Sequence, residues 1–145
     1  MRKIALIILL KLFYISNAYG LIEVDITRGN LDPLPIAVSP LHVDIKSENF
    51  EGLKVKSLGS DISSVIEKNF KSTGLFNPLK KDAFVQKPDI AHIKPRFEDW
   101  RLIKAQALVT GKILVKDSKL KVEFRLWDLT ASKEMIALAF TTTPS

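Results

Sequence analysis

The chain contains no cysteine among its 145 residues, and its only two histidines are His42 and His92. The lack of cysteine excludes disulfide bonds, cysteine-based zinc sites and thiol catalysis, although it leaves the redox compartment open. Neither histidine has a second histidine at metal-ligand spacing, so both are expected at the surface or at a strand edge. No metal or cofactor site is therefore predicted.

Motifs for catalytic or nucleotide-binding chemistry are also missing. No serine lies in a Gly-x-Ser-x-Gly context, and VTGK at 109–112 lacks the rest of a phosphate-binding loop. Glu98 and Asp99 are adjacent on a short predicted helix, so their side chains should diverge into solvent. Trp100 and Trp127 could stack on a ligand, but their places on periodic elements favour core packing. The protein is not expected to be an enzyme.

The first twenty residues differ from everything that follows. Two basic residues precede an apolar stretch, Ile4–Ile15, which only Lys11 interrupts, and small residues come next. This is the layout of a secretory signal peptide, with cleavage after Ala18 or after Gly20, and the stretch is short for a transmembrane helix. We predict a signal peptide at 1–20 and export. An uncleaved anchor and a buried N-terminal helix are the alternatives.

Positive charge is spread thinly over the mature chain. The net charge of +6 falls to +3 when the three basic residues of the leader are removed. The remaining lysines are scattered, and most alternate with apolar residues, which is typical of a solvated face and not of a phosphate-binding stripe. Nucleic-acid binding is therefore not predicted. A cytoplasmic nucleic-acid-binding module, motivated by the pI near 9.6, is the alternative.

The mature chain begins with a predicted extended arm. In 21–29 three apolar residues alternate with polar ones, which is the period of a half-buried strand. Two prolines in 30–35 then separate this arm from the rest. The apolar run at 36–45 predicts a strand covered on both faces, in which Pro40 ends the regular pairing or forces a bulge.

One longer helix is predicted at 60–74, after a mixed polar and apolar segment at 46–59 that resembles a loop. Four apolar residues of the helix share one stripe, and Ser60 or Asp61 can cap its start. Gly74 can end it in the left-handed conformation. The apolar residues that follow Gly74 are expected to return the chain to the core as a packed joint: Leu75, Phe76 and Leu79.

The rest of the chain predicts one short helix and mostly strands. Asp128 should initiate the last turn, and Gly111 should mark a bulge or close packing. The predicted elements are a short strand at 83–86, a helix in 96–105 starting at Pro95, and strands at 106–116, 119–129 and 134–143. The predicted fold class is α/β, a mixed sheet with two helices packed on it and an antiparallel meander at the C-terminal end.

Four segments, in order and with similar spacing, resemble the N-terminal domain of the TolB family. They are PIAVSPL (35–41), SSVIEKNFKSTGLFNPL (63–79), RFEDWRLIKAQALVTGKI (96–113) and KVEFRLWDL (121–129). The resemblance implies an anticodon-binding-like domain at 30–145, a likeness of fold that does not imply RNA binding. It also implies a non-enzymatic periplasmic interaction module of the Tol–Pal cell-envelope system, involved in outer-membrane integrity and cell division.

The resemblance also implies a partner for the arm. In this family the arm is associated with binding the C-terminal domain of TolA, and by position it corresponds to Leu21, Ile22, Glu23, Val24, Asp25, Ile26 and Thr27. The family's β-propeller, which holds the site for the lipoprotein Pal, has no counterpart in this sequence, so Pal is not expected as a partner. The helix that follows the last strand in the family is missing too, which predicts uncovered apolar sheet surface and marginal stability.

We expect the mature protein to begin at Tyr19 or Leu21, because export would remove the leader. Mass spectrometry of the N-terminal peptide measures this directly. A chain that still carries Met1 would contradict cleavage and would favour the cytoplasmic alternative.

Overall fold

Ten short elements lie in the residues that the computed structural model describes, which are 32–44, 55–116 and 119–143. The strands are β1 (Leu34–Val38), β2 (His42–Val43), β3 (Phe76–Pro78), β4 (Ala107–Lys116), β5 (Lys119–Asp128) and β6 (Lys133–Thr142). The helices are α2 (Val55–Ser72), the 3₁₀ turn η1 (Lys81–Ala83), α3 (Pro88–Ala91) and α4 (Phe97–Leu102).

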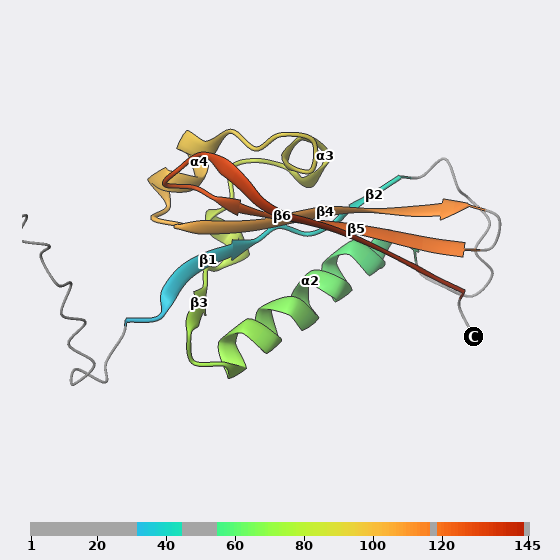
Figure 1. Cartoon of the computed structure of the whole chain (residues 1–145), viewed down its shortest axis with the longest axis horizontal. Helices are drawn as coiled ribbons and strands as arrows, with labels where there is room; N and C mark the ends of the chain where they lie inside the picture. Colours follow the sequence, from blue (N-terminus) through green and yellow to red (C-terminus); the bar gives the residue numbers. More distant parts are fainter. Residues whose placement is uncertain (1–31, 45–54, 117–118, 144–145) are drawn as a thin grey trace, which may run out of the picture. The chain divides into compact units, whose positions relative to one another are not determined.

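The strands form one mixed sheet in the order β3-β1-β4-β5-β6, with β2 paired to β4 beside β1 (Figure 1). β1 runs parallel to both β3 and β4, whereas β4, β5 and β6 are antiparallel neighbours. The parallel pairs require crossover connections, which α2 and the segment containing α3 and α4 supply. The predicted α/β class and its C-terminal antiparallel meander are confirmed.

Helices cover both faces of the parallel half of the sheet, with α2 on one side and α3 and α4 on the other (Figure 1). Because successive strand residues point to opposite faces, Ile36 and Val38 of β1 pack against apolar residues of α2. Ala37 faces the other way, into a buried cluster with Trp100 of α4 and Trp127 of β5. The core therefore has two layers, and both tryptophans lie in it, as predicted.

The start of the long helix differs from the prediction. α2 begins at Val55, so the predicted loop is wrong for 55–59, while the part of it before Val55 lies outside the described residues. The apolar stripe continues upstream through Leu58, which packs with Ile62 on the cluster around Leu41. Ser60 and Asp61 lie inside the helix and do not cap its start, and the Ser60 carbonyl accepts bonds from the hydroxyls of the serines three and four residues later, at 2.9 and 2.8 Å.

Gly59 lies inside this helix because the backbone of another segment touches it. A Cβ atom at Gly59 would lie 2.1 Å from the carbonyl oxygen of Leu41, which no side chain could accommodate without movement. The Leu41 amide donates a hydrogen bond of 3.1 Å to the Gly59 carbonyl. Leu41 belongs to the break between β1 and β2, which confirms the interruption expected at Pro40.

The joint after α2 is confirmed in its backbone and in two of its three apolar residues. Gly74 has a φ of 71°, the left-handed conformation that ends the helix. Phe76 packs in the cluster around Ile36, and Leu79 packs in the cluster around Trp100. Leu75 is 62% exposed, so its predicted core position is wrong. Its carbonyl accepts a hydrogen bond from Leu34 while its side chain stays outside.

The strand predicted at 83–86 does not form. A buried side-chain amide holds the connection between β3 and α4 instead. Residues 83–86 contain the end of η1 and then irregular backbone. The Gln86 side chain is only 4% exposed, and its Oε1 accepts bonds from Trp100 Nε1 at 2.8 Å and from the Arg96 amide at 3.0 Å. The predicted second helix is confirmed as α4, and α3 is an additional helix that periodicity did not indicate.

We expect Gly59→Ala to lower the free energy of unfolding by roughly 1–3 kcal/mol, because the added methyl group overpacks the contact with Leu41. This loss should exceed the gain of about 1 kcal/mol in helix propensity. Urea unfolding followed by circular dichroism measures it. Ser60→Ala, at the next and exposed position of the same helix, should change stability by less than about 0.5 kcal/mol. An equally stable Gly59→Ala protein would contradict the close contact.

Candidate interaction surfaces

The predicted site residues all lie outside the described residues, so the arm stays a prediction. They are Leu21, Ile22, Glu23, Val24, Asp25, Ile26 and Thr27. The described residues begin at Asp32, shortly before β1, which lies inside the sheet between β3 and β4. Two other surfaces are described: an apolar face on the C-terminal hairpin and a pair of histidines beside β2.

One face of the hairpin formed by β5 and β6 is apolar along three successive cross-strand pairs. Phe124 and Phe140 of this face contact each other edge to face, with ring centroids 6.1 Å apart. On β6 the side chains stay about half exposed, at 49% for Ile136, 53% for Leu138 and 57% for Phe140. We call the six residues the hairpin face: the pairs Val122 with Phe140, Phe124 with Leu138, and Leu126 with Ile136.

The opposite face of the same hairpin is polar. Glu123 lies opposite Ala139, and Arg125 lies opposite Ala137. Glu123 forms an ion pair with Lys121 at 2.8 Å, and Arg125 forms one with Glu134 at 3.2 Å. An antiparallel sheet normally turns its polar face to water and its apolar face to a core. The apolar hairpin face is therefore on the side where a packing partner is expected.

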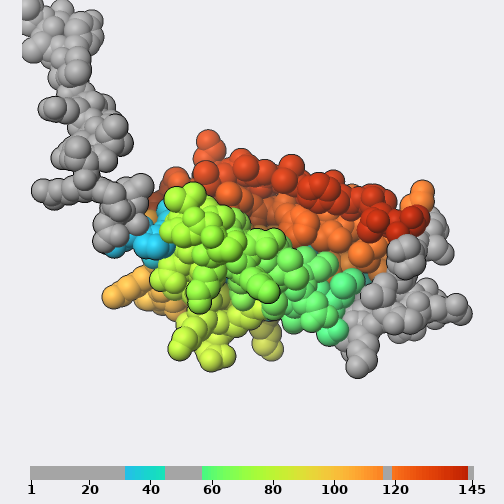
Figure 2. Space-filling view, turned by 90° about the horizontal axis from the view of Figure 1, so that it is seen from below, coloured from blue at the N-terminus to red at the C-terminus, as the bar shows by residue number. Residues whose placement is uncertain are grey.

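A groove runs between α2 and the hairpin face. Ile66 and Phe70 of α2 line one side, Val109 of β4 lies at the base, and residues of β5 and β6 line the other side. The groove has a volume of about 300 Å³. Figure 2 shows the two hairpin strands, orange to red, lying beside α2, in green. On the β5 strand of this face, Val122 and Leu126 lie in apolar clusters that include side chains of α2, whereas the β6 side chains remain exposed.

The chemistry of this groove suits binding and not catalysis. The side chains that line it are apolar apart from Arg125, which is paired with Glu134. Among the described residues, no cluster of three or more His, Asp or Glu side chains is arranged to hold a metal ion. No helix within those residues is long and apolar enough to cross a membrane.

The two histidines stack on each other. The ring centroids of His42, on β2, and His92, at the end of α3, lie 4.4 Å apart with an angle of 5° between the planes. His92 Nδ1 lies 3.0 Å from the carbonyl oxygen of Pro88. Because a carbonyl oxygen can only accept a hydrogen bond, Nδ1 is the protonated nitrogen and the donor. Packing of α3 beside β2 creates this contact, and no spacing in the sequence indicated it.

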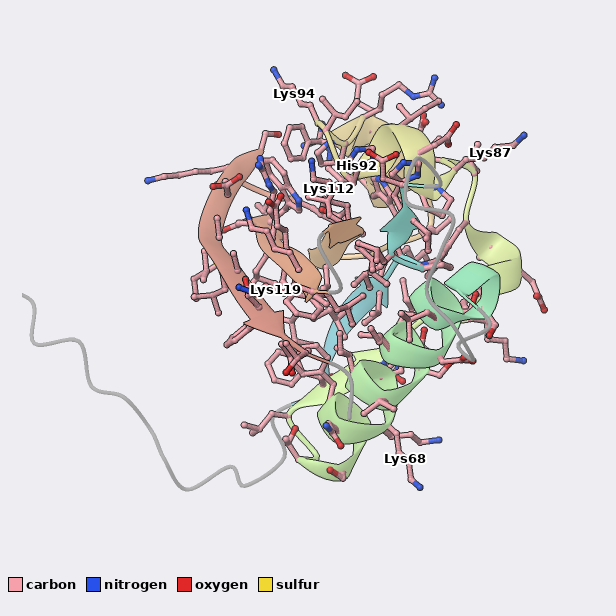
Figure 3. The ribbon with its side chains drawn as sticks, turned by 90° about the vertical axis from the view of Figure 1, so that its right-hand side faces the viewer. Lys68, Lys87, His92, Lys94, Lys112 and Lys119 are labelled. Carbon is pink, nitrogen blue, oxygen red and sulfur yellow. The ribbon has the colours of Figure 1, made fainter. Side chains whose placement is uncertain are left out.

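Burial is the main cause that lowers the pKa of His42 below its usual 6.5, and the neighbouring His92 lowers it further. Asp44 and Asp89 oppose this shift, and Lys112 adds to it. Figure 3 shows Lys112 close to His92, whereas the other labelled lysines point in several directions. The labelled lysines thus form no single stripe in this view.

The fold and these surfaces define an α/β domain that presents apolar and mixed contact surfaces. The model of the family described as TolB amino-terminal domain matches residues 22–135, and the chain therefore belongs to this family. The curated Tol-Pal system protein TolB of Pelagibacter ubique (strain HTCC1062) is 68% identical over 131 residues. That match covers 89% of this chain and 29% of the relative, so the chain spans less than a third of the relative's length.

Solved structures share the fold at low identity. TolB from Acinetobacter baumannii superposes with a TM-score of 0.56 at 18% identity, over 78% of this chain and 24% of that one. The C-terminal domain of LpoB from Escherichia coli gives the same TM-score of 0.56 at 6% identity, over 80% of this chain and 87% of that one. The family assignment predicted from the four sequence segments is confirmed.

We expect His42 to titrate below 6.5 in an NMR pH titration, because burial and His92 disfavour its protonated form. The unfolded chain then binds the proton more readily, so stability should fall as pH decreases from 6.5 toward the folded pKa, and should be unaffected above 6.5. His92→Ala should raise the pKa of His42, whereas Ile93→Ala, at an exposed neighbouring position, should not change it. Titration of His42 at or above 6.5 in the unsubstituted protein would contradict the described contact.

Proposed function

We propose that this protein is a non-enzymatic, periplasmic protein–protein interaction module of the Tol–Pal system that contributes to outer-membrane integrity and cell division. The observation that carries the proposal is the 68% identity to a Tol-Pal system protein TolB across most of this chain. The predicted leader at 1–20 supports a periplasmic location. The scattered lysines and this leader disfavour the cytoplasmic nucleic-acid-binding alternative.

Two buried polar side chains of the described core serve to hold its tryptophans. Gln86 accepts the indole proton of Trp100, and Thr110 accepts that of Trp127 at 2.9 Å. Both acceptors are buried and serve to hold tryptophans. Asp128 accepts a hydrogen bond from the Ala131 amide at 2.8 Å, which confirms its predicted role in the turn. These groups stabilise the fold.

The proposed partner is the C-terminal domain of TolA, and the proposed binding element is the arm at 21–27. Its alternating sequence suits addition of a strand to an exposed sheet edge, where backbone groups supply hydrogen bonds and every second side chain enters the partner. Ile22, Val24 and Ile26 would form the buried face.

We expect Val24→Asp combined with Ile26→Asp to weaken TolA binding at least about 100-fold, because two carboxylates would be buried without partners. The measurement is an NMR titration of the isotope-labelled chain with the C-terminal domain of TolA. Glu23→Ser combined with Asp25→Ser changes the polar side of the same arm and is the matched control, which should retain most of the affinity. Unchanged affinity of the aspartate variant would remove the arm from the mechanism.

A further inference from the structure

The short helix α3 packs against β2 and β4 through a small number of side chains. The backbone amides at 90–93 all donate hydrogen bonds to carbonyls within 87–90, so these bonds hold the segment together and do not join it to the sheet. Among the four residues of α3 only Ala91 is buried, and Ile90 is 48% exposed. Each remaining contact between α3 and the sheet therefore matters for its docking.

The stack of His42 on His92 is one of these contacts, and it joins β2 to the end of α3. The two rings are nearly parallel, with centroids 4.4 Å apart. Nδ1 of His92 donates to the Pro88 carbonyl, so the neutral form of this ring has no proton on Nε2. A neutral ring can stack on a neutral or a protonated one, but two protonated rings would place like charges face to face. The contact therefore suits at most one protonated ring.

Charged residues from the neighbouring elements surround the pair, and their charges balance. From α2, Gly59 and Ser60 line the recess beside His42, and neither is charged. The cations are Lys87 before α3, Lys112 of β4 and Arg125 of β5, and the carboxylates are Asp44 after β2, Asp89 of α3 and Glu123 of β5. With three charges of each sign, these surroundings supply no excess of negative charge that could hold two protonated rings together.

We propose that the stacked histidines form an acid-sensitive switch, which holds α3 on β2 while at most one ring is protonated and releases α3 when both are. Release would open the recess between His92 and the sheet, where Lys112, Glu123 and Arg125 lie. The sheet itself should persist, because β4 and β5 pair along ten residues without α3. This inference goes beyond the proposed function and does not depend on it.

The first test is amide hydrogen exchange of the full chain, resolved by NMR and corrected for the intrinsic effect of pH on exchange. The docked pair lowers the pKa of His42, so docking should weaken as the pH falls below 6.5. From about pH 7.5 to about pH 5.0 we expect protection of the amides at 90–93 to fall at least about tenfold. Amides of β4 and β5 should keep their protection.

His42→Phe separates the charge of the pair from its packing. Phenylalanine retains a ring that can stack on His92, and a protonated His92 would then face an aromatic ring that attracts a cation. The amides at 90–93 should therefore stay protected in acid. His92→Phe is the reciprocal variant, although it also loses the hydrogen bond to Pro88. Ile93→Phe is the matched control, because it adds a ring at an exposed neighbouring position and should keep the acid response.

Three results would overturn the proposal. The first is protection at 90–93 that does not change with pH. The second is an equal loss of protection throughout β4 and β5, which would indicate global unfolding. The third is the same acid response in His42→Phe as in the unsubstituted protein, which would exclude the charge of the pair as the cause.

Thiol labelling provides a second readout of release. Because the chain has no cysteine, Ala91→Cys introduces a single thiol at a fully buried position, and Ile93→Cys introduces one at an exposed position of the same segment. The ratio of their maleimide labelling rates cancels the common effect of pH on thiolate formation. This ratio, buried over exposed, should rise about tenfold from about pH 7.5 to about pH 5.0. A constant ratio would overturn the release of α3.

Discussion

The position of α2 depends on the backbone contact between Gly59 and Leu41. This contact joins the helix to the break between β1 and β2, where the Leu41 amide binds the Gly59 carbonyl and no side chain fits between them. At the other end of α2, Gly74 turns the chain directly into β3, which pairs with β1. Both ends of α2 are thus held over the parallel half of the sheet.

The apolar side of β6 stays exposed beside α2. α2 lies on β1, β2 and β3, and Ile136, Leu138 and Phe140 of β6 are about half exposed. The hairpin is well ordered by its own pairing, with an antiparallel register between β5 and β6 that is interrupted only near Leu126 and Trp127. An apolar face on a strongly paired hairpin is typical of a surface that binds another polypeptide.

The residues that stabilise the sheet thus differ from those proposed to bind a partner. On the α3 and α4 side, buried tryptophans are anchored by Gln86 and Thr110, and Gly111 allows the close approach of Glu123. These interactions stabilise the sheet. Binding is left to a segment outside that framework, the arm proposed for TolA, which precedes β1.

Local signals in the sequence determined the elements whose pattern is repeated over many residues. The strands β4, β5 and β6 were predicted within one residue at each end, because alternation over ten residues leaves little choice of register. The break at Pro40 and the turn at Gly74 were likewise predictable, since they depend on the backbone limits of single residues.

Tertiary structure alone decided the features that depend on contacts between distant segments. The local sequence predicts a loop at Gly59, because the contact that permits glycine in this helix comes from the distant Leu41. The stacking of His42 on His92, and the buried Gln86 in place of a strand, also arise from packing between segments that are not adjacent in sequence. The sequence by itself determined the α/β fold, its family and most strand positions, because these follow from periodicity and local geometry. The extent of α2, the groove beside it and the exposure of the hairpin face were decided only when the helix docked on the sheet.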